Sequence, residues 1–493
     1  AIDNGETIAV FGDYDVDGMC ASAILYEGLK DLGAEVDVYV PDRIEEGYGL
    51  NEKAVEKIYA DGTGLLVTVD CGISSAKEVA LAKKLGMGVI VTDHHQLPEE
   101  LPKCIIVNPA MALDKKAKWS NLCGAGVSFK LVQALYEWKY GQENVWKNTK
   151  KLLDLAALAT IADIVPLRGD NRIIVKFGLE VLAQGGRIGL RELAKVAAGN
   201  NNIEMTTMLA SFGLAPRLNA CGRIGDVHTG LELLLTKDKD KAWAIAKRLD
   251  EENRDRQNIE RQIFEEALLN VADGTTDAHR GIVVCGDNWH PGVIGIVASR
   301  IAERFYTPVI VFTRNNSLYK GSGRSIEGFH LQQALAKCAD ILESFGGHAQ
   351  AAGLSIKAEN MDEFIRRFGD LVASSDEQIF LPRVKIDCVL NQGSINYNFY
   401  NELAKLQPFG MHNPPPIFAL RGLKAGESRT VGTNSDHLKI KFVTSKGDIN
   451  AIGFKKAYLE DTVKHDLVDV AFNLEKNVFN GRTNLQLNIC DIK

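Results

Sequence analysis

The stretch "VFGDYDVDGMC", residues 10–20, places three aspartates at alternate positions directly after an apolar run. Asp13, Asp15 and Asp17 carry like charges that repel one another at such short range. They are therefore either solvated or neutralised by something positive. The apolar run that leads into them, "TIAVF" at residues 7–11, predicts a short strand, so this acidic turn stands at a strand's carboxyl end.

Outward from this stretch, the first part of the chain alternates predicted strands with predicted helices. Further apolar runs are "EVDVYV" (35–40), "LLVTVD" (65–70), "GVIVTD" (88–93) and "CIIVNP" (104–109). Helical patterns lie between them at 19–32, 51–60 and 74–85. This alternation indicates βαβ units and a mainly parallel sheet, which makes the fold class α/β.

Polar residues also end two of the other predicted strands. Asp70 follows the third strand, and Asp93, His94 and His95 follow the fourth. Taken alone, Asp70 is more commonly a helix cap, and the three aspartates of the first stretch are more commonly a solvated turn. However, ligands of open α/β sheets bind outside the carboxyl ends of the strands. Three separate clusters are thus expected at one edge.

A fourth candidate stands in "LLDLAALATIADIVPL", residues 152–167, where two aspartates interrupt an apolar segment. A buried carboxylate is unfavourable unless it is paired or binds a metal. At about 100° per residue, Asp154 and Asp163 lie on opposite sides of a regular helix, so only one can face the site. We select Asp163, near the helix end.

This set of side chains favours hard divalent cations. Carboxylates with one or two imidazoles and no thiolate suit Mn²⁺ or Mg²⁺ better than structural zinc, and so many carboxylates suggest two ions. Two ions about 3.5–4 Å apart are the arrangement that hydrolyses phosphodiesters.

Composition limits the remaining possibilities. The 493 residues are 45% apolar, enough for two or three cores, and no apolar run approaches membrane-spanning length. The net charge of −7 means that any nucleic-acid contact comes from local basic patches. Nine cysteines without a CxxC pair favour a reducing compartment, the cytoplasm. The chain begins at Ala1 rather than Met, from which we expect missing upstream residues. It contains no GxxxxGK[ST] loop, so ATP-driven motion is not expected.

The middle of the chain offers candidates for substrate handling. "PRLNACGRIGD" (216–226) carries Arg217 and Arg223, and a long polar helix is expected within 237–272, more as a solvated spacer than as a DNA contact. A second α/β unit begins at "GIVVCG" (281–286) and includes Arg324 in "GSGRS" and His348 in "GGHAQAAG". Glycine turns let backbone N–H groups approach a phosphate, to which Arg or His adds charge-assisted hydrogen bonds; simple tight turns are the alternative.

From about residue 384 the pattern becomes β. Apolar residues alternate at 384, 386 and 388 and again at 468–474, and Asn480-Gly481 predicts a hairpin. This pattern suits a small barrel. Candidate contacts to a single strand are Lys439, Lys441, Phe454, Phe479 and Arg482, although Phe residues in a small barrel commonly belong to its core.

The motifs "DYDVDG", "VDCG", "TDHH" and "ATIAD", in this order, resemble motifs I to IV of the DHH phosphoesterase superfamily. "PRLNACGRIGD", "NWHPGVIGIVASRI", "GSGRSIEGFHL", "FGGHAQAAG" and "LQPFGMHNPPPIF" resemble its bacterial family of single-stranded-DNA exonucleases, over nearly the whole chain. The resemblance implies four parts: a parallel-sheet DHH catalytic domain (1–190), a helical connector with a long helix (191–275), an α/β DHHA1 substrate-binding domain (276–383) and an OB-like β-barrel that binds single strands (384–493).

The resemblance also implies roles for individual residues. The metal ligands it implies are Asp15, Asp17, Asp70, His94 and Asp163, with Asp70 bridging two ions, Mn²⁺ or Mg²⁺. Asp13, Asp93 and His95 would be further ligands, or would support the ligands and contact phosphate. Substrate would be bound by Arg217, Arg223, Arg324, Gly346, Gly347 and His348. One departure is Phe11, where several relatives carry His, so no ligand is available at that position.

The activity implied by the resemblance is processive removal of mononucleotides from the 5′ end of single-stranded DNA, in DNA repair and recombination. The implied partners are single-stranded DNA, a single-strand-binding protein and a helicase. Two alternatives remain: a DHH enzyme acting on oligoribonucleotides or cyclic dinucleotides, and a non-catalytic DNA-binding scaffold of replication assemblies. The intact acidic clusters argue against the scaffold, because a pure binder has no use for their repulsion.

Overall fold

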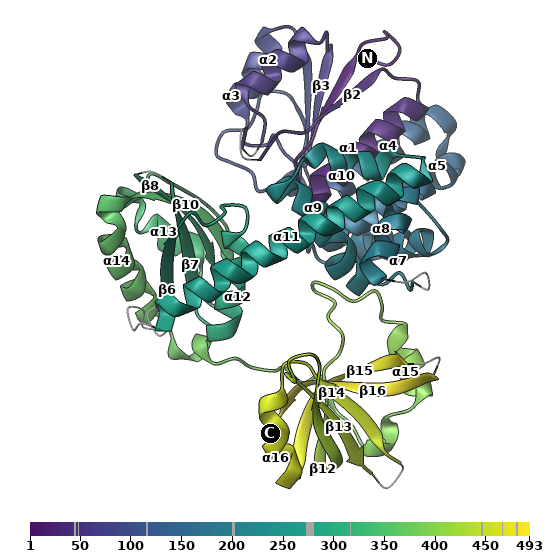
Figure 1. Ribbon diagram of the computed structural model, residues 1–493. Coiled ribbons are helices and arrows are strands. Elements are labelled where there is room, and N and C mark those ends of the chain that lie inside the picture. Colours follow the sequence, from purple (N-terminus) through teal and green to yellow (C-terminus); the bar gives the residue numbers. More distant parts are fainter. Residues whose placement is uncertain are drawn as a thin grey trace. The chain divides into compact units, whose positions relative to one another are not determined.

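The structure is a computed structural model that describes residues 1–43, 46–47, 49–114, 117–199, 203–272, 281–315, 317–444, 447–465, 467–479 and 482–493 (Figure 1). The chain divides into two compact units, one of residues 1–165 and 169–382, the other of residues 166–168 and 383–493. None of the helices in the described ranges combines the length and apolar character that a membrane crossing requires.

The first sheet has the strand order β2-β1-β3-β4-β5, and every neighbouring pair is parallel. Its strands are β1 (Ile8–Phe11), β2 (Val36–Tyr39), β3 (Leu65–Val69), β4 (Gly88–Thr92) and β5 (Ile105–Val107). The five predicted strands and the parallel sheet are thereby confirmed. The order turns back at β1, which has β2 on one side and β3 on the other, and such a switch point is where an α/β sheet opens a binding crevice.

Helices cover both faces of this sheet. They are α1 (Val16–Asp31), α2 (Glu52–Ala60), α3 (Ala76–Lys84) and α4 (Gly124–Tyr140). Residues of α2 and α3 share a buried cluster with Phe11 and Leu66 of the sheet, whereas α1 and α4 pack together and against its strands. The first helix begins three residues before the predicted residue 19, because the Asp15 carboxylate accepts a hydrogen bond from the Gly18 N–H (3.0 Å) and caps it.

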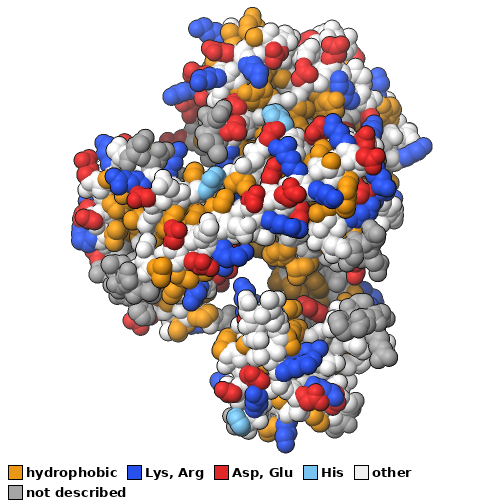
Figure 2. All heavy atoms as spheres, viewed as in Figure 1, with side chains coloured by type: hydrophobic (Ala, Val, Ile, Leu, Met, Phe, Trp, Pro, Cys, Tyr) orange, Lys and Arg blue, Asp and Glu red, His pale blue; other side chains and the backbone are white. Residues whose placement is uncertain are grey.

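A helical region follows the sheet. It contains α5 (Gln142–Thr149), α6 (Leu153–Ala162), α7 (Gly169–Ala183), α8 (Ile188–Ala198), the π-helical turn η3 (Leu209–Leu214), α9 (Ala215–Ile224), α10 (Val227–Leu235) and α11 (Lys239–Ala272). The predicted long helix is confirmed, since α11 has 34 residues, and charged side chains of both signs are mixed over its visible surface (Figure 2). It is more than a solvated spacer: Ile263 and Phe264 are buried in the core of the next domain.

The second sheet has the order β6-β7-β8-β10-β9, in which only β6 and β7 are parallel. Its elements are β6 (Ile282–Asp287), α12 (Ile294–Phe305), β7 (Val309–Asn315), β8 (Leu318–Arg324), α13 (Leu331–Ala336), β9 (Ser344–Gly347), β10 (Ala351–Lys357) and α14 (Met361–Ala373). One face packs against α11 and α12, the other against α13 and α14. This domain is the second α/β unit that the sequence predicts.

The second unit is built on a strongly bent sheet of order β11-β12-β13-β14-β16-β15, in which β12 also pairs with β15 and so brings the sheet round on itself. Its elements are β11 (Cys388–Val389), α15 (Tyr397–Ala404), β12 (Phe418–Val431), β13 (His437–Val443), β14 (Ile449–Gly453), α16 (Glu460–His465), β15 (Val468–Phe479) and β16 (Arg482–Ile492). The OB-like architecture is as predicted.

Two local predictions for this unit have different outcomes. The strand expected from residue 384 is wrong in extent, because only Cys388 and Val389 pair with β12, while Val384 and Ile386 are 40% and 45% exposed. An alternating pattern of apolar residues predicts a strand with one buried face, but it does not show whether other residues pack on that face. Asn480-Gly481 lies outside the described residues, but Phe479 pairs with Arg482 in the expected antiparallel register.

Candidate metal centre

The carboxyl ends of β1, β3 and β4 and the end of α6 deliver the predicted acidic residues to one place. Ligand atoms lie within 4.8 Å of one another in three groups: Asp13, Asp15 and Asp70; Asp17, His94 and Asp163; and Asp70, His94 and His95. The sequence places these residues on four separate segments. Their meeting follows from the parallel register of the strands, which brings the strand ends to one edge.

Backbone groups hold Asp17 and Asp70 in place. The Asp17 carboxylate accepts hydrogen bonds from the N–H groups of Gly124 (2.7 Å) and Ala125 (2.8 Å), at the positive end of α4. Asp70 adopts a left-handed backbone conformation (φ +60°), which turns its side chain out of the strand. Gly124 must be glycine, because a Cβ there would lie 2.5 Å from the Asp70 side chain.

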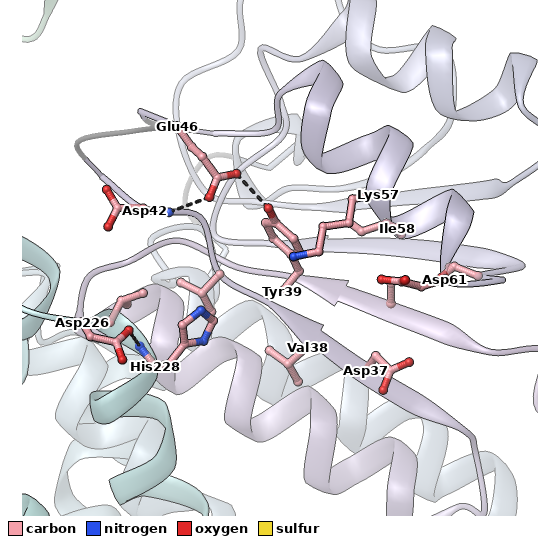
Figure 3. A pocket seen from close by; sticks show the side chains of 14 residues that line it. Asp37, Val38, Tyr39, Asp42, Glu46, Lys57, Ile58, Asp61, Asp226 and His228 are labelled. Atoms are coloured by element: carbon pink, nitrogen blue, oxygen red, sulfur yellow. Dashed lines mark hydrogen bonds between the residues drawn. The ribbon is translucent and has the colours of Figure 1, made fainter.

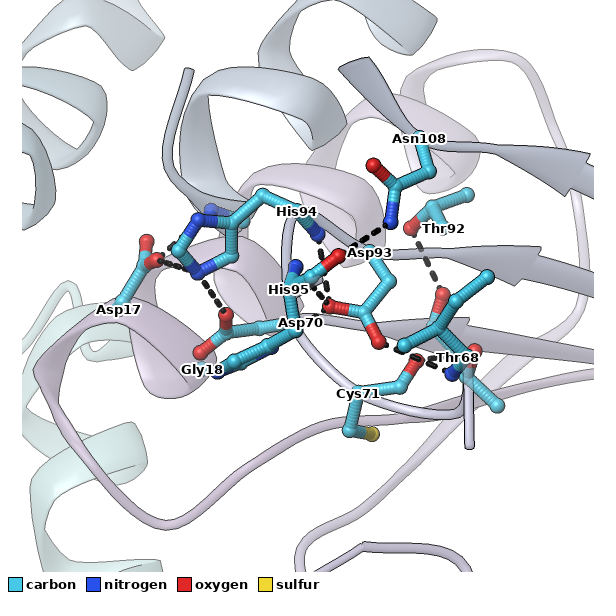
Figure 4. A network of polar contacts seen from close by, with 12 residues as sticks. Asp17, Gly18, Thr68, Asp70, Cys71, Thr92, Asp93, His94, His95 and Asn108 are labelled. Atoms are coloured by element: carbon cyan, nitrogen blue, oxygen red, sulfur yellow. Dashed lines mark hydrogen bonds and ion pairs between the residues drawn. The ribbon is translucent and has the colours of Figure 1, made fainter. Parts of the chain in front are cut away.

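The His94 imidazole stands at the centre of the cluster (Figure 4). Its Nε2 atom lies 3.1 Å from Asp70 Oδ1 and 3.7 Å from both Asp17 Oδ2 and Asp163 Oδ2. Burial lowers the pKa of His94, against the opposing effect of Asp17, so the neutral form with a free lone pair is favoured. A neutral imidazole among carboxylates is a ligand for a divalent cation.

Asp93 has a different task. Its Oδ1 atom accepts hydrogen bonds from the His94 N–H (2.7 Å), the His95 N–H (3.0 Å) and the His95 ring Nδ1 (2.7 Å), and Oδ2 accepts one from the Ile73 N–H (3.0 Å). These bonds hold the pKa of Asp93 below its usual value although burial raises it. The Asp93 carboxylate thus fixes the backbone of the two histidines, and both of its oxygens already accept hydrogen bonds.

His95 is the cationic partner of this carboxylate. Burial lowers the pKa of His95, but the hydrogen bond and charge of Asp93 raise it more, to about 9. The ring is therefore an imidazolium at neutral pH, and 37% of its side chain is exposed. It is a positive hydrogen-bond donor beside the acidic cluster.

The negative charges of the remaining carboxylates are not balanced by neighbouring positive groups in the described part of the chain. Burial first, and then the neighbouring aspartates, raise the pKa values of Asp13, Asp15 and Asp70, and raise that of Asp163 to about 8. Among the described residues, Asp13 Oδ1 is buried without a hydrogen-bond partner. Buried carboxylates that repel one another fit divalent cations, so these residues suit the two ions that the sequence predicts.

Asp154 and Asp163, the two aspartates that the sequence singles out in and just after α6, point to different sides, as expected. Asp163 faces the histidines, whereas Asp154 accepts a hydrogen bond from the Arg187 N–H (3.2 Å) and lies 3.5 Å from its Nε. Phe11, the position at which the resemblance led us to expect a departure, is fully buried and stacks on Tyr39 with ring centroids 5.5 Å apart. It belongs to the core of the sheet and offers no ligand.

A second group of functional interest is cationic. Arg223 on α9 donates to the Gly292 carbonyl (2.8 Å), which joins the helical region to the second sheet domain. Its pKa is lowered to about 10 by burial, followed by the charges of Arg43 and Arg256. Burial also lowers the pKa of Arg324. Buried positive groups such as these are suited to bind an anion.

Two contributors to this region, Arg43 and His290, were not predicted. Arg43 lies over the Tyr14 ring at 5.0 Å, and its charge, after burial, lowers the pKa of His290. His290 stands just before α12 in "NWHPG", and a histidine ahead of a glycine-containing helix start was a usable signal. Nothing in the sequence around Arg43 marks it, because its role depends on a contact between distant segments.

The remaining predicted substrate residues are Arg217 and residues 346–348. Arg217 donates to Asp250 (2.8 Å) and to the Gly213 carbonyl (2.7 Å), so its guanidinium joins α9 to α11 and is already engaged. Gly346 and Gly347 end β9, where they pair with β10, and His348 stands in the exposed turn that follows, where its N–H donates to the Ala351 carbonyl (2.8 Å).

The predicted strand contacts of the second unit lie on its β-sheet. Lys439 and Lys441 project from β13 on the side opposite its buried residues, and Lys441 pairs with Asp448 (2.8 Å). Phe454 is 54% exposed, with its ring against His437 at 5.3 Å. The side chains of Phe479 and Arg482 lie outside the described part of the chain.

A cavity of about 510 Å³ lies elsewhere, along the outer edge of β2 (Figure 3). Glu46 accepts hydrogen bonds there from the Tyr39 hydroxyl (2.9 Å) and the Asp42 N–H (2.9 Å). Asp226 and His228, at the start of α10, complete the lining. No residue predicted to bind metal or substrate lines it, so this cavity is distinct from the acidic cluster.

Comparison with known proteins agrees with this architecture. Residues 7–160 match the DHH family, N-terminal domain; residues 279–374 match the DHHA1 domain; and residues 386–491 match the RecJ OB domain. The fold and the acidic cluster therefore define a DHH-family protein with a DHHA1 domain.

Relatives narrow the assignment. The single-stranded-DNA-specific exonuclease RecJ of Bacillus subtilis is 38% identical over the whole chain, which spans 62% of that relative. RecJ of Salmonella typhimurium is 36% identical over the whole chain, which spans 88% of it. The crystal structure of RecJ from Thermus thermophilus in complex with Mn²⁺ matches all of the chain and 70% of its own, with a TM-score of 0.85 and 32% identity. The chain belongs to the RecJ family.

Proposed function

We propose that this chain is a metal-dependent exonuclease that hydrolyses single-stranded DNA in the 5′ to 3′ direction to mononucleotides, in DNA repair and recombination. The observation that carries the proposal is the buried cluster in which Asp70 belongs to two groups of ligand atoms. It is supported by the RecJ relatives, which are named single-stranded-DNA-specific exonucleases and include one crystallised with Mn²⁺.

We assign the ligands to two ions, Mn²⁺ or Mg²⁺. Asp13, Asp15 and Asp70 would hold one ion, and Asp17, His94 and Asp163 the other, with Asp70 shared. Of the roles that the resemblance leaves open for Asp13, we assign that of a ligand, because its Oδ1 atom is buried without a partner among the described residues. When bound, two such ions supply a nucleophile at neutral pH and offset the charge on the phosphate.

The protein's own groups perform the remaining tasks. His95, protonated because Asp93 accepts from its ring, would donate a hydrogen bond to a phosphate oxygen and hold the proton that the leaving group takes. Asp93 positions both histidines and touches no substrate. A buried carboxylate that accepts from an imidazolium in this way fixes the direction of the ring.

Substrate phosphates would be held by Arg43, Arg223 and Arg324, with His290 and His348 as further donors. The pKa values of Arg223 and Arg324 are lowered in the absence of an anion, so a bound phosphate relieves an unfavourable interaction. Arg217 is left out of this set, since Asp250 and Gly213 take its donors.

The second unit would contribute affinity for the strand. His437, Lys439 and Phe454 combine an exposed aromatic ring with a positive charge on one part of the sheet, the combination that single-strand-binding surfaces use. We also propose that a helicase supplies the strand and a single-strand-binding protein covers it. A cytoplasmic setting fits the nine cysteines, all of which are free thiols.

End-labelled single-stranded DNA, single-stranded RNA and a cyclic dinucleotide, each incubated with protein stripped by EDTA and reloaded with Mn²⁺ or Mg²⁺, test the proposal. We expect mononucleotides from the 5′ end of DNA alone, and only after reloading. Preferential hydrolysis of RNA or of the cyclic dinucleotide would assign the site to another DHH activity. Binding of DNA without hydrolysis under any metal would make the chain a scaffold.

A further inference from the structure

The helix that carries Asp163 ends in an unusual way. A residue just past a helix end commonly adopts a left-handed conformation, for which glycine is the usual choice. This chain follows the rule after other helices: left-handed glycines at Gly33, Gly62, Gly86 and Gly185 follow α1, α2, α3 and α7. After α6 the residue is Ile164, with φ +56°.

Isoleucine is poorly suited to this position. A β-branched side chain at positive φ crowds the backbone, so glycine or asparagine would end α6 with less strain. Packing does not compensate, because Ile164 is 66% exposed. By contrast Tyr306, which ends α12 at φ +49°, packs its side chain against the core of the second sheet. The Ile164 side chain therefore stabilises neither the end of α6 nor the hydrophobic core.

The position of Ile164 points to a role at the acidic cluster. Ile164 directly follows Asp163, whose carboxylate lies 3.7 Å from His94 Nε2. Adjacent Cα atoms are about 3.8 Å apart, so Ile164 offers an exposed apolar surface at the rim of the acidic cluster. Strained residues that the surrounding fold holds in place are concentrated at functional sites.

We infer that Ile164 is the apolar contact for the nucleobase of the nucleotide under attack. Apolar side chains commonly hold a base by its face, and a contact with the face is open to every base. It would fix the nucleotide while its phosphate lies at the ions. The inference rests on the proposed nuclease function and adds a substrate-contacting residue to it.

The test uses the full chain loaded with Mn²⁺ and three variants. Ile164→Gly removes the side chain and relieves the backbone, and Ile164→Asn keeps a side chain that tolerates positive φ. Ile173→Asn alters an isoleucine of α7 that is 51% exposed and serves as the control. kcat/KM is measured on a single strand and on the same strand with a tetrahydrofuran abasic nucleotide at the cleaved position, and Tm is measured for each variant.

We expect both Ile164 variants to lose about tenfold in kcat/KM on the intact strand and less than about twofold on the abasic one, as for one lost base contact. Their Tm should match or exceed that of the wild type, and the control should behave like the wild type. Unchanged kcat/KM, or equal losses on both strands, would overturn the role of Ile164. A wild-type protein that hydrolyses no single-stranded DNA would instead refute the proposed function.

Discussion

The acidic cluster of the first unit and the proposed strand-binding surface of the second place their side chains in opposite environments. Asp70 is 2% exposed and its pKa is raised, whereas Phe454 is 54% exposed and Lys441 pairs with Asp448 in partly solvated surroundings. Charge interactions are strong in surroundings that exclude water, so groups that act on a bond are buried before the substrate arrives. Groups that hold the strand can stay solvated. The first region should therefore control kcat and the second KM.

The largest effect is expected from Asp70→Ala. Loss of a shared ligand should lower kcat by at least about a thousandfold, since each factor of ten corresponds to about 1.4 kcal/mol and the ions supply several. The metal-free variant should keep or gain thermal stability, because one carboxylate of a repelling cluster is gone. Turnover and melting by circular dichroism measure the two effects. Asp37→Ala, an exposed acid of the same sheet, is the control; substantial turnover by the Asp70 variant with Mn²⁺ would remove its bridging role.

The second prediction concerns pH and metal. Asp163 has a pKa of about 8 in the folded, metal-free chain and about 4 when unfolded, so between these values the folded state binds more protons. Stability of the metal-free protein should thus fall as pH rises from 5 to 8. Mn²⁺ needs the ionised carboxylates, so the Tm increase it produces should be larger at pH 8 than at pH 5. Calorimetry with EDTA or Mn²⁺ checks this. A metal-induced shift independent of pH would contradict it.

The third prediction tests recognition of the strand end. Arg324→Gln should raise KM about tenfold for a 5′-phosphorylated strand, the size of a lost hydrogen bond to a charged group, and less for a 5′-hydroxyl strand. His348→Ala should act in the same direction, more weakly, because the turn that carries it is exposed. Arg217→Gln is the matched control: it should lower Tm by breaking the pair with Asp250 and leave the preference unchanged. Equal losses on both strands would indicate general backbone binding.

The smallest effect is expected on the second unit. Phe454→Ala should raise KM about fivefold on long strands, at the low end of the usual range for one stacked base. Lys439→Gln should act similarly and weaken with added salt. Oligonucleotides too short to reach this surface should be hydrolysed as before. Leu467→Ala, a residue 67% exposed in the same unit, provides the control. A fall in kcat on short substrates would mean that the second unit helps to form the active site.

Sequence patterns were sufficient for the strands and for the meeting of the acidic segments. Five apolar runs and the residues that end them fix a parallel sheet, and the parallel register then brings Asp15, Asp70 and His94 together. The helical repeat likewise showed that only one of Asp154 and Asp163 can face the cluster, and its place near the helix end selected Asp163. Asp163 lies 3.7 Å from His94 Nε2, whereas Asp154 pairs with Arg187. These inferences depend on periodicity, which neighbouring residues impose directly.

Roles that depend on the direction of a single side chain could not be obtained in this way. Nothing in "TDHH" shows that Asp93 turns back to three N–H groups while His94 faces the cluster, and nothing in "PRLNACGR" shows that Arg217 pairs with α11 while Arg223 reaches the next domain. Each of these directions is selected by a partner from a distant segment.

The sequence by itself determined the α/β fold, the order of the acidic motifs and the preference for hard divalent cations, because strand periodicity and ligand chemistry are local properties. Only the tertiary structure decided that Asp13 Oδ1 is buried with no hydrogen-bond partner among the described residues, that Arg43 and His290 lie near Arg223, and that Ile164 is strained and exposed beside Asp163. Burial and charge proximity depend on which distant segments fold against one another, and no spacing along the chain encodes that.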